Sequence, residues 1–163
     1  MDNWYSVSTY DNSADDFLHM FGGFHDFRII EVNYCGSKDS VDVLLEYDDR
    51  SLRILLRFEG YVQFYIAPVD EYEAEWIWGV SLHRYKNQIR WINDEWRGIE
   101  TEPIGSEKKI TFFQGNTLIW AIVDKNGNPL PVTDDLLHPC WRTYNCETNQ
   151  YDEEYHDFSV IPV

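Results

Sequence analysis

The chain has 163 residues and a formal net charge of −16 at pH 7, because 29 Asp and Glu oppose 13 Lys and Arg. A surface with this charge repels phosphate, so the composition excludes a general nucleic-acid binder. Aromatic residues form 17% of the chain, which excludes a disordered chain and predicts one packed domain over residues 1–163.

The sequence indicates a cytoplasmic protein with reduced thiols. Residues 1–16 contain no basic stretch followed by an apolar one, as a secretory signal would require. No run approaches the roughly 18 apolar residues of a membrane-spanning helix. An odd number of cysteines, three, favours free thiols in a reducing compartment. Nucleotide and calcium motifs are missing, so no cofactor is expected.

The N-terminal region predicts a loose end and one short helix. Residues 1–12 are mostly polar, and Ser13 can cap a helix over residues 14–21 with acidic residues in its first turn. The pair Gly22-Gly23 ends this helix, with one of the two glycines in the left-handed conformation. A helix this short needs tertiary packing, for which Phe17, Leu18 and Phe21 are suited.

From residue 28 the apolar period changes to two, which predicts strands over residues 28–34, 41–47, 51–59 and 62–66. Apolar side chains share one face of each predicted strand, as in an antiparallel sheet with one wetter face. These sets are Ile30, Val32 and Tyr34; Val41, Val43, Leu45 and Tyr47; Leu52, Ile54, Leu56 and Phe58; and Val62, Phe64 and Ile66.

The middle of the chain is less regular. Alternation predicts strands over residues 76–82 and 88–93 around a turn at Lys86-Asn87, followed by a long polar loop over residues 94–108. Residues 109–113 and 118–123 then predict a hairpin about Gln114-Gly115-Asn116.

The last third begins with a turn cluster at residues 126–129. Thr133 can cap a short helical turn over residues 134–138. Residues 140–163 mix acids with aromatics and predict a C-terminal arm or an edge strand. With about eight or nine strands and one short N-terminal helix, the chain is predicted to be mainly β (α+β), an antiparallel meander curled as a barrel or folded as a sandwich.

Two near-identical tetrapeptides place histidine beside aspartate, Phe24-His25-Asp26-Phe27 and Tyr155-His156-Asp157-Phe158. Imidazole and carboxylate groups can bind a metal or move a proton. Neighbouring residues on a strand point to opposite faces, so each pair would need partners from elsewhere in the fold. The alternative is that His25 holds the turn after Gly22-Gly23 through a backbone hydrogen bond.

A second cluster joins His138, Cys140 and Cys146. Imidazole and thiolate suit zinc, with His156 or Asp157 as a fourth ligand, although the spacing differs from that of usual structural zinc sites. The alternative is that both cysteines are small apolar side chains beneath the C-terminal arm.

Six tryptophans allow a further interpretation as a sugar-binding platform or as the lining of a ligand-binding β-barrel, with core packing as the alternative. They are Trp76, Trp78, Trp91, Trp96, Trp120 and Trp141.

Acidic runs are the broadest signal in the chain. They form either a solvated surface or a surface that binds a basic protein, in the way that inhibitors bind basic nucleases. The predicted partner-binding residues are Asp70, Glu71, Glu73, Glu75, Asp152, Glu153 and Glu154.

The opening Gly22-Gly23-Phe24-His25-Asp26, followed by isoleucine on a first strand, resembles that of a group of small acidic bacterial proteins. The segments 58–62 (Phe-Glu-Gly-Tyr-Val) and 118–120 (Leu-Ile-Trp) are similar in character, so the resemblance covers residues 20–123. Some proteins of this kind look like immunity proteins encoded beside toxins. The resemblance implies no catalytic residues, and the long C-terminal arm departs from it.

These patterns predict a protein-binding module with a basic protein as its partner, in concrete form an immunity-type inhibitor of a basic toxin. The alternatives are a small metal-dependent enzyme that uses His25 and Asp26, and a ligand-binding β-barrel. No nucleic-acid or membrane partner is expected, and the oligomeric state stays open.

Overall fold

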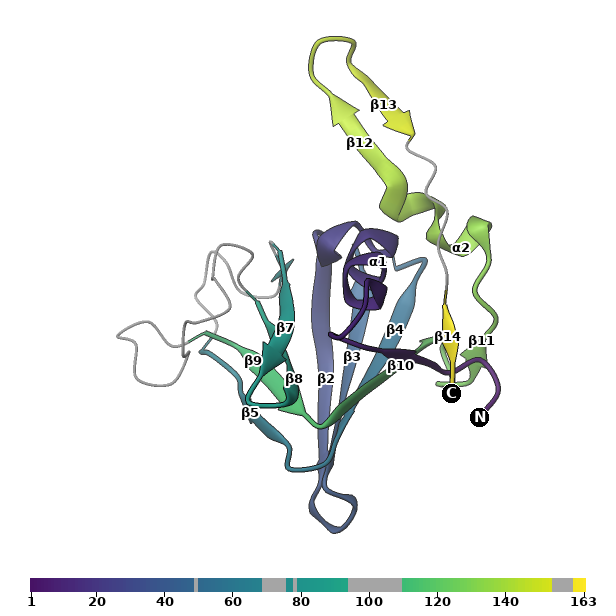
Figure 1. Ribbon diagram of the computed structural model, residues 1–163. Helices are drawn as coiled ribbons and strands as arrows, with labels where there is room; N and C mark the ends of the chain where they lie inside the picture. The colour runs from purple at the N-terminus through teal and green to yellow at the C-terminus, as the bar shows by residue number, and fades with distance from the viewer. Residues whose placement is uncertain (49, 69–75, 78, 94–109, 154–159) are drawn as a thin grey trace.

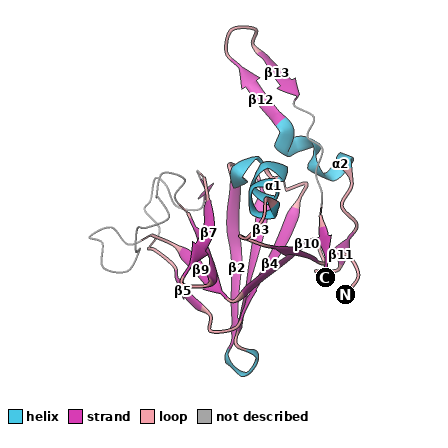
Figure 2. Cartoon of the chain, in the orientation of Figure 1, coloured by secondary structure: helices cyan, strands magenta, loops and turns pink. Residues whose placement is uncertain are grey.

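The computed structural model describes residues 1–48, 50–68, 76–77, 79–93, 110–153 and 160–163. Within these residues the strands form one sheet of eight strands, one of four strands and a separate two-stranded hairpin (Figure 1). Strands dominate and helices are few and short (Figure 2), so the prediction of a mainly β chain is confirmed. The two larger sheets are open rather than closed into a barrel, and they pack through their inner faces as in a sandwich.

The first sheet has the strand order β14-β1-β10-β4-β3-β2-β6, and β11 pairs with β10 beside this path. Its strands are antiparallel where they pair. They are β1 (Tyr5–Val7), β2 (Phe27–Cys35), β3 (Ser40–Tyr47), β4 (Arg53–Glu59), β6 (Trp76–Ile77), β10 (Thr117–Val123), β11 (Pro129–Leu130) and β14 (Ile161–Pro162).

The second sheet has the order β5-β9-β8-β7 and is also antiparallel. Its strands are β5 (Gln63–Tyr65), β7 (Ser81–Tyr85), β8 (Gln88–Ile92) and β9 (Phe112–Gly115). Lys86 and Asn87 both have positive φ and make the predicted tight turn between β7 and β8. The predicted loop over residues 94–108 lies outside the described residues.

Strands β3 and β4 follow the predicted alternation residue by residue. Val43, Leu45, Ile54 and Leu56 are completely buried, while the side chains between them face outward. This pattern is kept because a shift of one residue would expose the whole apolar set.

Strand β2 departs from the predicted alternation at a β-bulge. Its pairing with β3 shifts between Ile29 and Glu31, which leaves Ile30 outside the ladder and 38% exposed. Val32 still packs against the core, but Tyr34 at the strand end is 59% exposed and contacts the ring of Phe64. The predicted shared face of Ile30, Val32 and Tyr34 is therefore wrong at Ile30.

The predicted hairpin about Gln114-Gly115-Asn116 is wrong. Strand β9 pairs with β5 and β8 in the second sheet, and β10 pairs with β1 and β4 in the first, so the chain passes from one sheet to the other without reversing. Residues 53–65 make the same passage beside it, from β4 to β5, with a bend at Gly60. Period-two alternation continues on both sides of Gly115 and Asn116. These two residues therefore mark a bend between two strands rather than the reversal of a hairpin.

Two α-helices are described, α1 (Ser13–Met20) and α2 (Asp134–Leu137), with the 3₁₀ segments η1 (Gly22–Phe24), η2 (Gly36–Lys38) and η3 (His138–Trp141). The N-cap of α1 is Asn12 rather than the predicted Ser13, whose hydroxyl instead donates to the carbonyl of Ser8. Both Gly22 and Gly23 have positive φ, where one was predicted. Among the described helices, none has the length and apolar character needed to cross a bilayer.

The core lies between the two sheets and α1. Phe17, Phe21 and Phe24 from the helical region pack against Trp120 of the first sheet and Trp91 of the second. Ring centroids in this cluster lie 4.6–5.5 Å apart, the range in which edge-to-face and tilted pairs are favourable. These aromatic contacts join the helical region to both sheets.

The C-terminal region combines both predicted forms, an arm and an edge strand. The η3 segment docks on the helical region, where Trp141 Nε1 donates to the Met20 carbonyl (3.2 Å), and on β3, where Tyr47 Oη donates to the Pro139 carbonyl (3.1 Å). Strands β12 (Arg142–Asn145) and β13 (Gln150–Glu153) form a hairpin that extends away from the two sheets (Figure 1). Strand β14 then pairs with β1 as an edge strand.

The bend at Gly60 gives a direct test of the fold. Gly60 and Gly127 have nearly equal φ values, 81° and 82°, but a Cβ on Gly60 would lie 2.8 Å from Asn116 Nδ2, whereas a Cβ on Gly127 would have nothing within 4 Å. Gly127→Ala should cost about 1–2 kcal/mol for the left-handed backbone alone. Gly60→Ala should cost about 1 kcal/mol more because Asn116 must move.

Urea unfolding of both variants measures these costs, because midpoints report stability directly when the dependence on denaturant (the m-value) is the same. Equal midpoints for the two variants would contradict the close packing of Asn116 on the bend.

Candidate functional site

The predicted metal or proton-transfer pair, His25 and Asp26, lies in the turn between η1 and β2 rather than on a strand. In this turn Asp26 has a φ of 68°, and His25 Nδ1 lies 3.1 Å from Asp26 Oδ1. The expectation that the two side chains diverge is therefore wrong. Both are about half exposed, and the His25 N–H donates to the carbonyl of Gly22 (3.3 Å), as the structural alternative predicts.

The second predicted metal cluster is not brought together by the part of the chain that the structure describes. His138 and Cys140 lie in η3, while Cys146 is exposed in the turn between β12 and β13. His156 lies outside the described residues. Within those residues, no group of three or more His, Cys, Asp or Glu side chains is placed to hold a metal ion.

Most of the predicted partner-binding acids lie outside the described residues, namely Asp70, Glu71, Glu73, Glu75 and Glu154. For Asp152 and Glu153 the structure describes the backbone only, which lies in β13 opposite Thr143 and Arg142. Their role in binding stays a prediction.

The tryptophans belong to the core where the structure describes their burial. Trp91, Trp120 and Trp141 are 0%, 2% and 6% exposed, so the sugar-platform interpretation is wrong for these three residues. Trp78 and Trp96 lie outside the described residues, and Trp76 begins β6.

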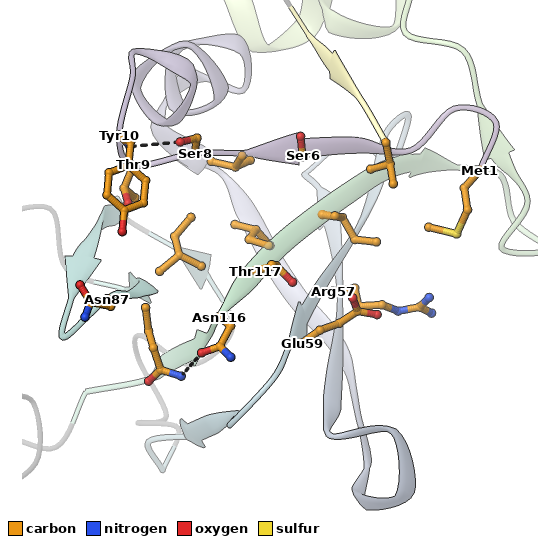
Figure 3. A pocket seen from close by; sticks show the side chains of 16 residues that line it. Met1, Ser6, Ser8, Thr9, Tyr10, Arg57, Glu59, Asn87, Asn116 and Thr117 are labelled. Carbon is orange, nitrogen blue, oxygen red and sulfur yellow. Dashed lines mark hydrogen bonds between the residues drawn. The ribbon is translucent and has the colours of Figure 1, made fainter.

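A pocket of about 570 Å³ lies where the two sheets part, between the end of β1 and the turn from β7 to β8 (Figure 3). We call it the junction pocket. It is lined by Met1, Ser6, Val7, Ser8, Thr9, Tyr10, Arg57, Glu59, Asn87, Gln88, Ile89, Asn116, Thr117, Leu118, Ile119 and Val163. It forms because β1 pairs with β10, while β8 pairs with β9, and the chain bends between β9 and β10.

Side-chain amides connect the junction pocket with a buried arginine. Gln88 Nε2 donates to Asn116 Oδ1 (3.0 Å, Figure 3) and to the Tyr61 carbonyl (3.2 Å). Gln88 Oε1 accepts a hydrogen bond from Gln114, whose own Oε1 accepts one from Arg90 Nε (2.7 Å). These bonds fix the amides of Gln88 and Asn116 at one side of the pocket.

The charged side of the junction pocket is formed by β4. Arg57 donates from Nε and from Nη2 to the two carboxylate oxygens of Asp42, at 2.7 and 2.8 Å. This hydrogen bonding raises the pKa of Arg57, and the charge of Glu59 also favours the cation. The guanidinium further stacks 5.0 Å from the ring of Trp4. Arg57 is thus held in place by Asp42 and Trp4.

Behind the pocket, the outer face of the second sheet buries a polar cluster. Arg90 is 3% exposed, and its guanidinium lies 3.5 Å over the ring of Tyr85. His83, 8% exposed, stands opposite Arg90 in the β7–β8 register. Burial, and then the charge of Arg90, lower the pKa of His83, so the imidazole is neutral at pH 7.

None of the junction-pocket residues was assigned to a site from the sequence. Nine of the sixteen come from four strands, β1, β4, β8 and β10, whose pairing the alternation does not specify, and seven come from segments outside the strands. Their side chains are mostly uncharged. Two sequence signals lie close to the pocket. Lys86-Asn87 predicts the tight turn at one side of it, and the glycines Gly60 and Gly115 mark the bends between the sheets.

Comparisons of the chain with protein-family models, with curated proteins and with solved structures gave no match.

The buried histidine predicts a pH dependence of stability. The pKa of His83 is lower in the folded protein than its value of about 6.5 in the unfolded chain. As the pH falls, the unfolded chain therefore binds more protons than the folded protein does. The contribution of His83 to the free energy of unfolding is therefore fully present above about pH 6.5, and it is lost as the pH falls toward the pKa of His83 in the folded protein.

We expect the free energy of unfolding of the wild type to fall between about pH 7.5 and pH 5.5, and the same curve to be flatter in His83→Gln. Urea unfolding at each pH measures both curves. Parallel curves would show that His83 takes no part in this pH dependence.

Proposed function

We propose that this protein is a cytoplasmic binding module for a basic protein, and that its concrete form is an immunity-type inhibitor of a basic toxin. The observation that carries the proposal is the net charge of −16 in a well-packed β domain. A charge of this size accelerates association with a basic partner and repels nucleic acid.

Internal pairing of the arginines supports the proposal. On the outer face of the first sheet, Arg28 and Arg53 both bind Glu46, and Arg57 binds Asp42. Glu46 is 2% exposed, and the hydrogen bond from Arg28 lowers its pKa despite the opposing effect of burial. These three arginines are occupied within the sheet, so they add little cationic surface for an acidic partner.

Exposed tyrosines also support a protein-binding surface. Tyr61, Tyr10 and Tyr34 are 78%, 71% and 59% exposed. Tyrosine is enriched at the centres of protein interfaces, because a rigid ring buries much area at a low cost in conformational entropy. Exposed tyrosines can anchor a partner that the net negative charge attracts.

The test begins with the partner itself. Native mass spectrometry of the tagged protein, captured gently from a lysate of its own host, reports bound metal, self-association and any stoichiometric partner. A basic partner without metal is the expected result. A metal-loaded species without a partner would contradict the proposal and favour an enzyme that uses His25 and Asp26.

Charge reversal then tests the acids predicted from sequence. Replacing Asp70, Glu71, Glu73 and Glu75 by Lys should slow association with the captured partner by about 10-fold at low salt and weaken its salt dependence. The same is expected for Asp152, Glu153 and Glu154. Stopped-flow or surface-based kinetics at several salt concentrations measure both effects.

A matched control reverses four exposed acids outside the predicted set, Asp2, Asp15, Asp48 and Glu147. If this control slows association as much as the test variants do, the attraction belongs to the whole molecule. If neither variant changes it, the acids serve as a solvated surface.

A further inference from the structure

We infer that the junction pocket receives an arginine side chain of the basic partner, together with the extended backbone on either side of it. This inference rests on the proposed function, since it assigns a place on the chain to the basic side chains that the partner carries. Charge, shape and hydrogen-bonding capacity of the pocket support it.

Two of the residues that line the junction pocket carry charged side chains, Arg57 and Glu59. Asp42 and Arg57 neutralise each other through two hydrogen bonds of 2.7 and 2.8 Å. Glu59, two residues further along β4, also lines the pocket. The carboxylate of Glu59 therefore repels an anionic ligand and attracts a cationic one.

The size and floor of the pocket suit a long side chain with a polar end. A volume of about 570 Å³ lies in the range of pockets that enclose small ligands, and it exceeds what a single methylene stem would fill. Val7, Ile89 and Leu118 line the pocket and are 8%, 4% and 1% exposed. The methylene groups of an arginine can pack on these buried side chains while the guanidinium lies at the polar side.

The polar lining offers acceptors for the five N–H groups of a guanidinium. The carboxylate of Glu59 can accept two parallel hydrogen bonds. Asn116 Oδ1 accepts one hydrogen bond from Gln88 and retains a second lone pair, and the hydroxyl of Thr117 adds another acceptor. Because the Gln88 and Gln114 amides hold Asn116 in place, this acceptor needs little reorganisation on binding.

An aromatic ring at the pocket provides the remaining contact. Tyr10 lines the pocket, and the guanidinium of Arg84 already lies 4.2 Å from its ring centroid. Tyr10 is nevertheless 71% exposed, which leaves room for contact with an arriving segment. A planar guanidinium suits this mixture of carboxylate, amide and ring better than the compact ammonium of lysine does.

The test uses three tripeptides with blocked ends, Gly-Arg-Gly, Gly-Lys-Gly and Gly-citrulline-Gly, titrated into the isotope-labelled protein. Citrulline has the shape of arginine without its charge. The arginine peptide should shift the side-chain NH₂ signals of Asn87, Gln88 and Asn116 and bind at least about 3-fold more tightly than the lysine peptide. The citrulline peptide should bind about 10-fold more weakly.

Two variants and a control assign the binding to the pocket. Glu59→Gln should weaken the arginine peptide about 5-fold or more, while Glu147→Gln, with the same change in net charge, should leave its affinity within 2-fold. Glu147 is exposed in the β12–β13 hairpin, on the part of the chain that extends away from the sheets (Figure 1). Thr117→Arg places a tethered guanidinium in the pocket, directly opposite Glu59 on the β4–β10 ladder, and should abolish the shifts while Glu59 itself stays unsubstituted.

Equal effects of Glu59→Gln and Glu147→Gln, or unchanged binding in a folded Thr117→Arg, would overturn the pocket assignment. Equal affinity of the lysine and arginine peptides would overturn the choice of arginine. The captured partner separates the two proposals. If it binds Glu59→Gln and Thr117→Arg as tightly as the wild type, the pocket inference fails while the proposed function stands. If no basic partner is captured although the arginine peptide binds the pocket, the proposed function fails.

Discussion

The rest of the structure depends on the bend at which two neighbouring chain segments leave the first sheet for the second. Close backbone approach makes it possible, since Gly115 lies against Glu59 so tightly that a Cβ would be 3.0 Å from its backbone nitrogen. Asp39 holds the other segment, because its carbonyl accepts from the Gly60 N–H and its carboxylate accepts from the N–H groups of Tyr61 and Val62. The bend thereby sets the angle between the sheets.

That angle decides what lies on each side of the sheets. Inner faces converge on the aromatic cluster around Trp91 and Trp120, which the α1 region closes from one end. On the diverging side, β1 and β8 separate and leave the junction pocket between them. The amides of Gln88 and Gln114 connect the pocket with Arg90 through hydrogen bonds, so a shift of Gln88 would also move the group that Arg90 binds.

Local patterns in the sequence predicted what depends on local chemistry. Alternation predicted β3 and β4, and Lys86-Asn87 predicted a turn, because side-chain period and positive φ are local properties. The bulge at Ile30 and the passage through Gly115 were missed, since both depend on which distant strand pairs with which. The junction pocket was missed for the same reason, and the pairing of His25 with Asp26 was missed because a turn replaced the assumed strand.

Three arginine side chains of this protein lie against aromatic rings. Arg57 lies between a carboxylate and a tryptophan ring, Arg84 lies over Tyr10, and Arg90 lies over Tyr85 with an amide oxygen at its Nε. In each case a flat cation is held by a ring, and in two of them by an oxygen acceptor as well. The junction pocket offers the same elements, with Glu59 and Asn116 as acceptors and Tyr10 as the ring. An arginine of a partner in this pocket would therefore make the same kinds of contact that hold the chain's own arginines.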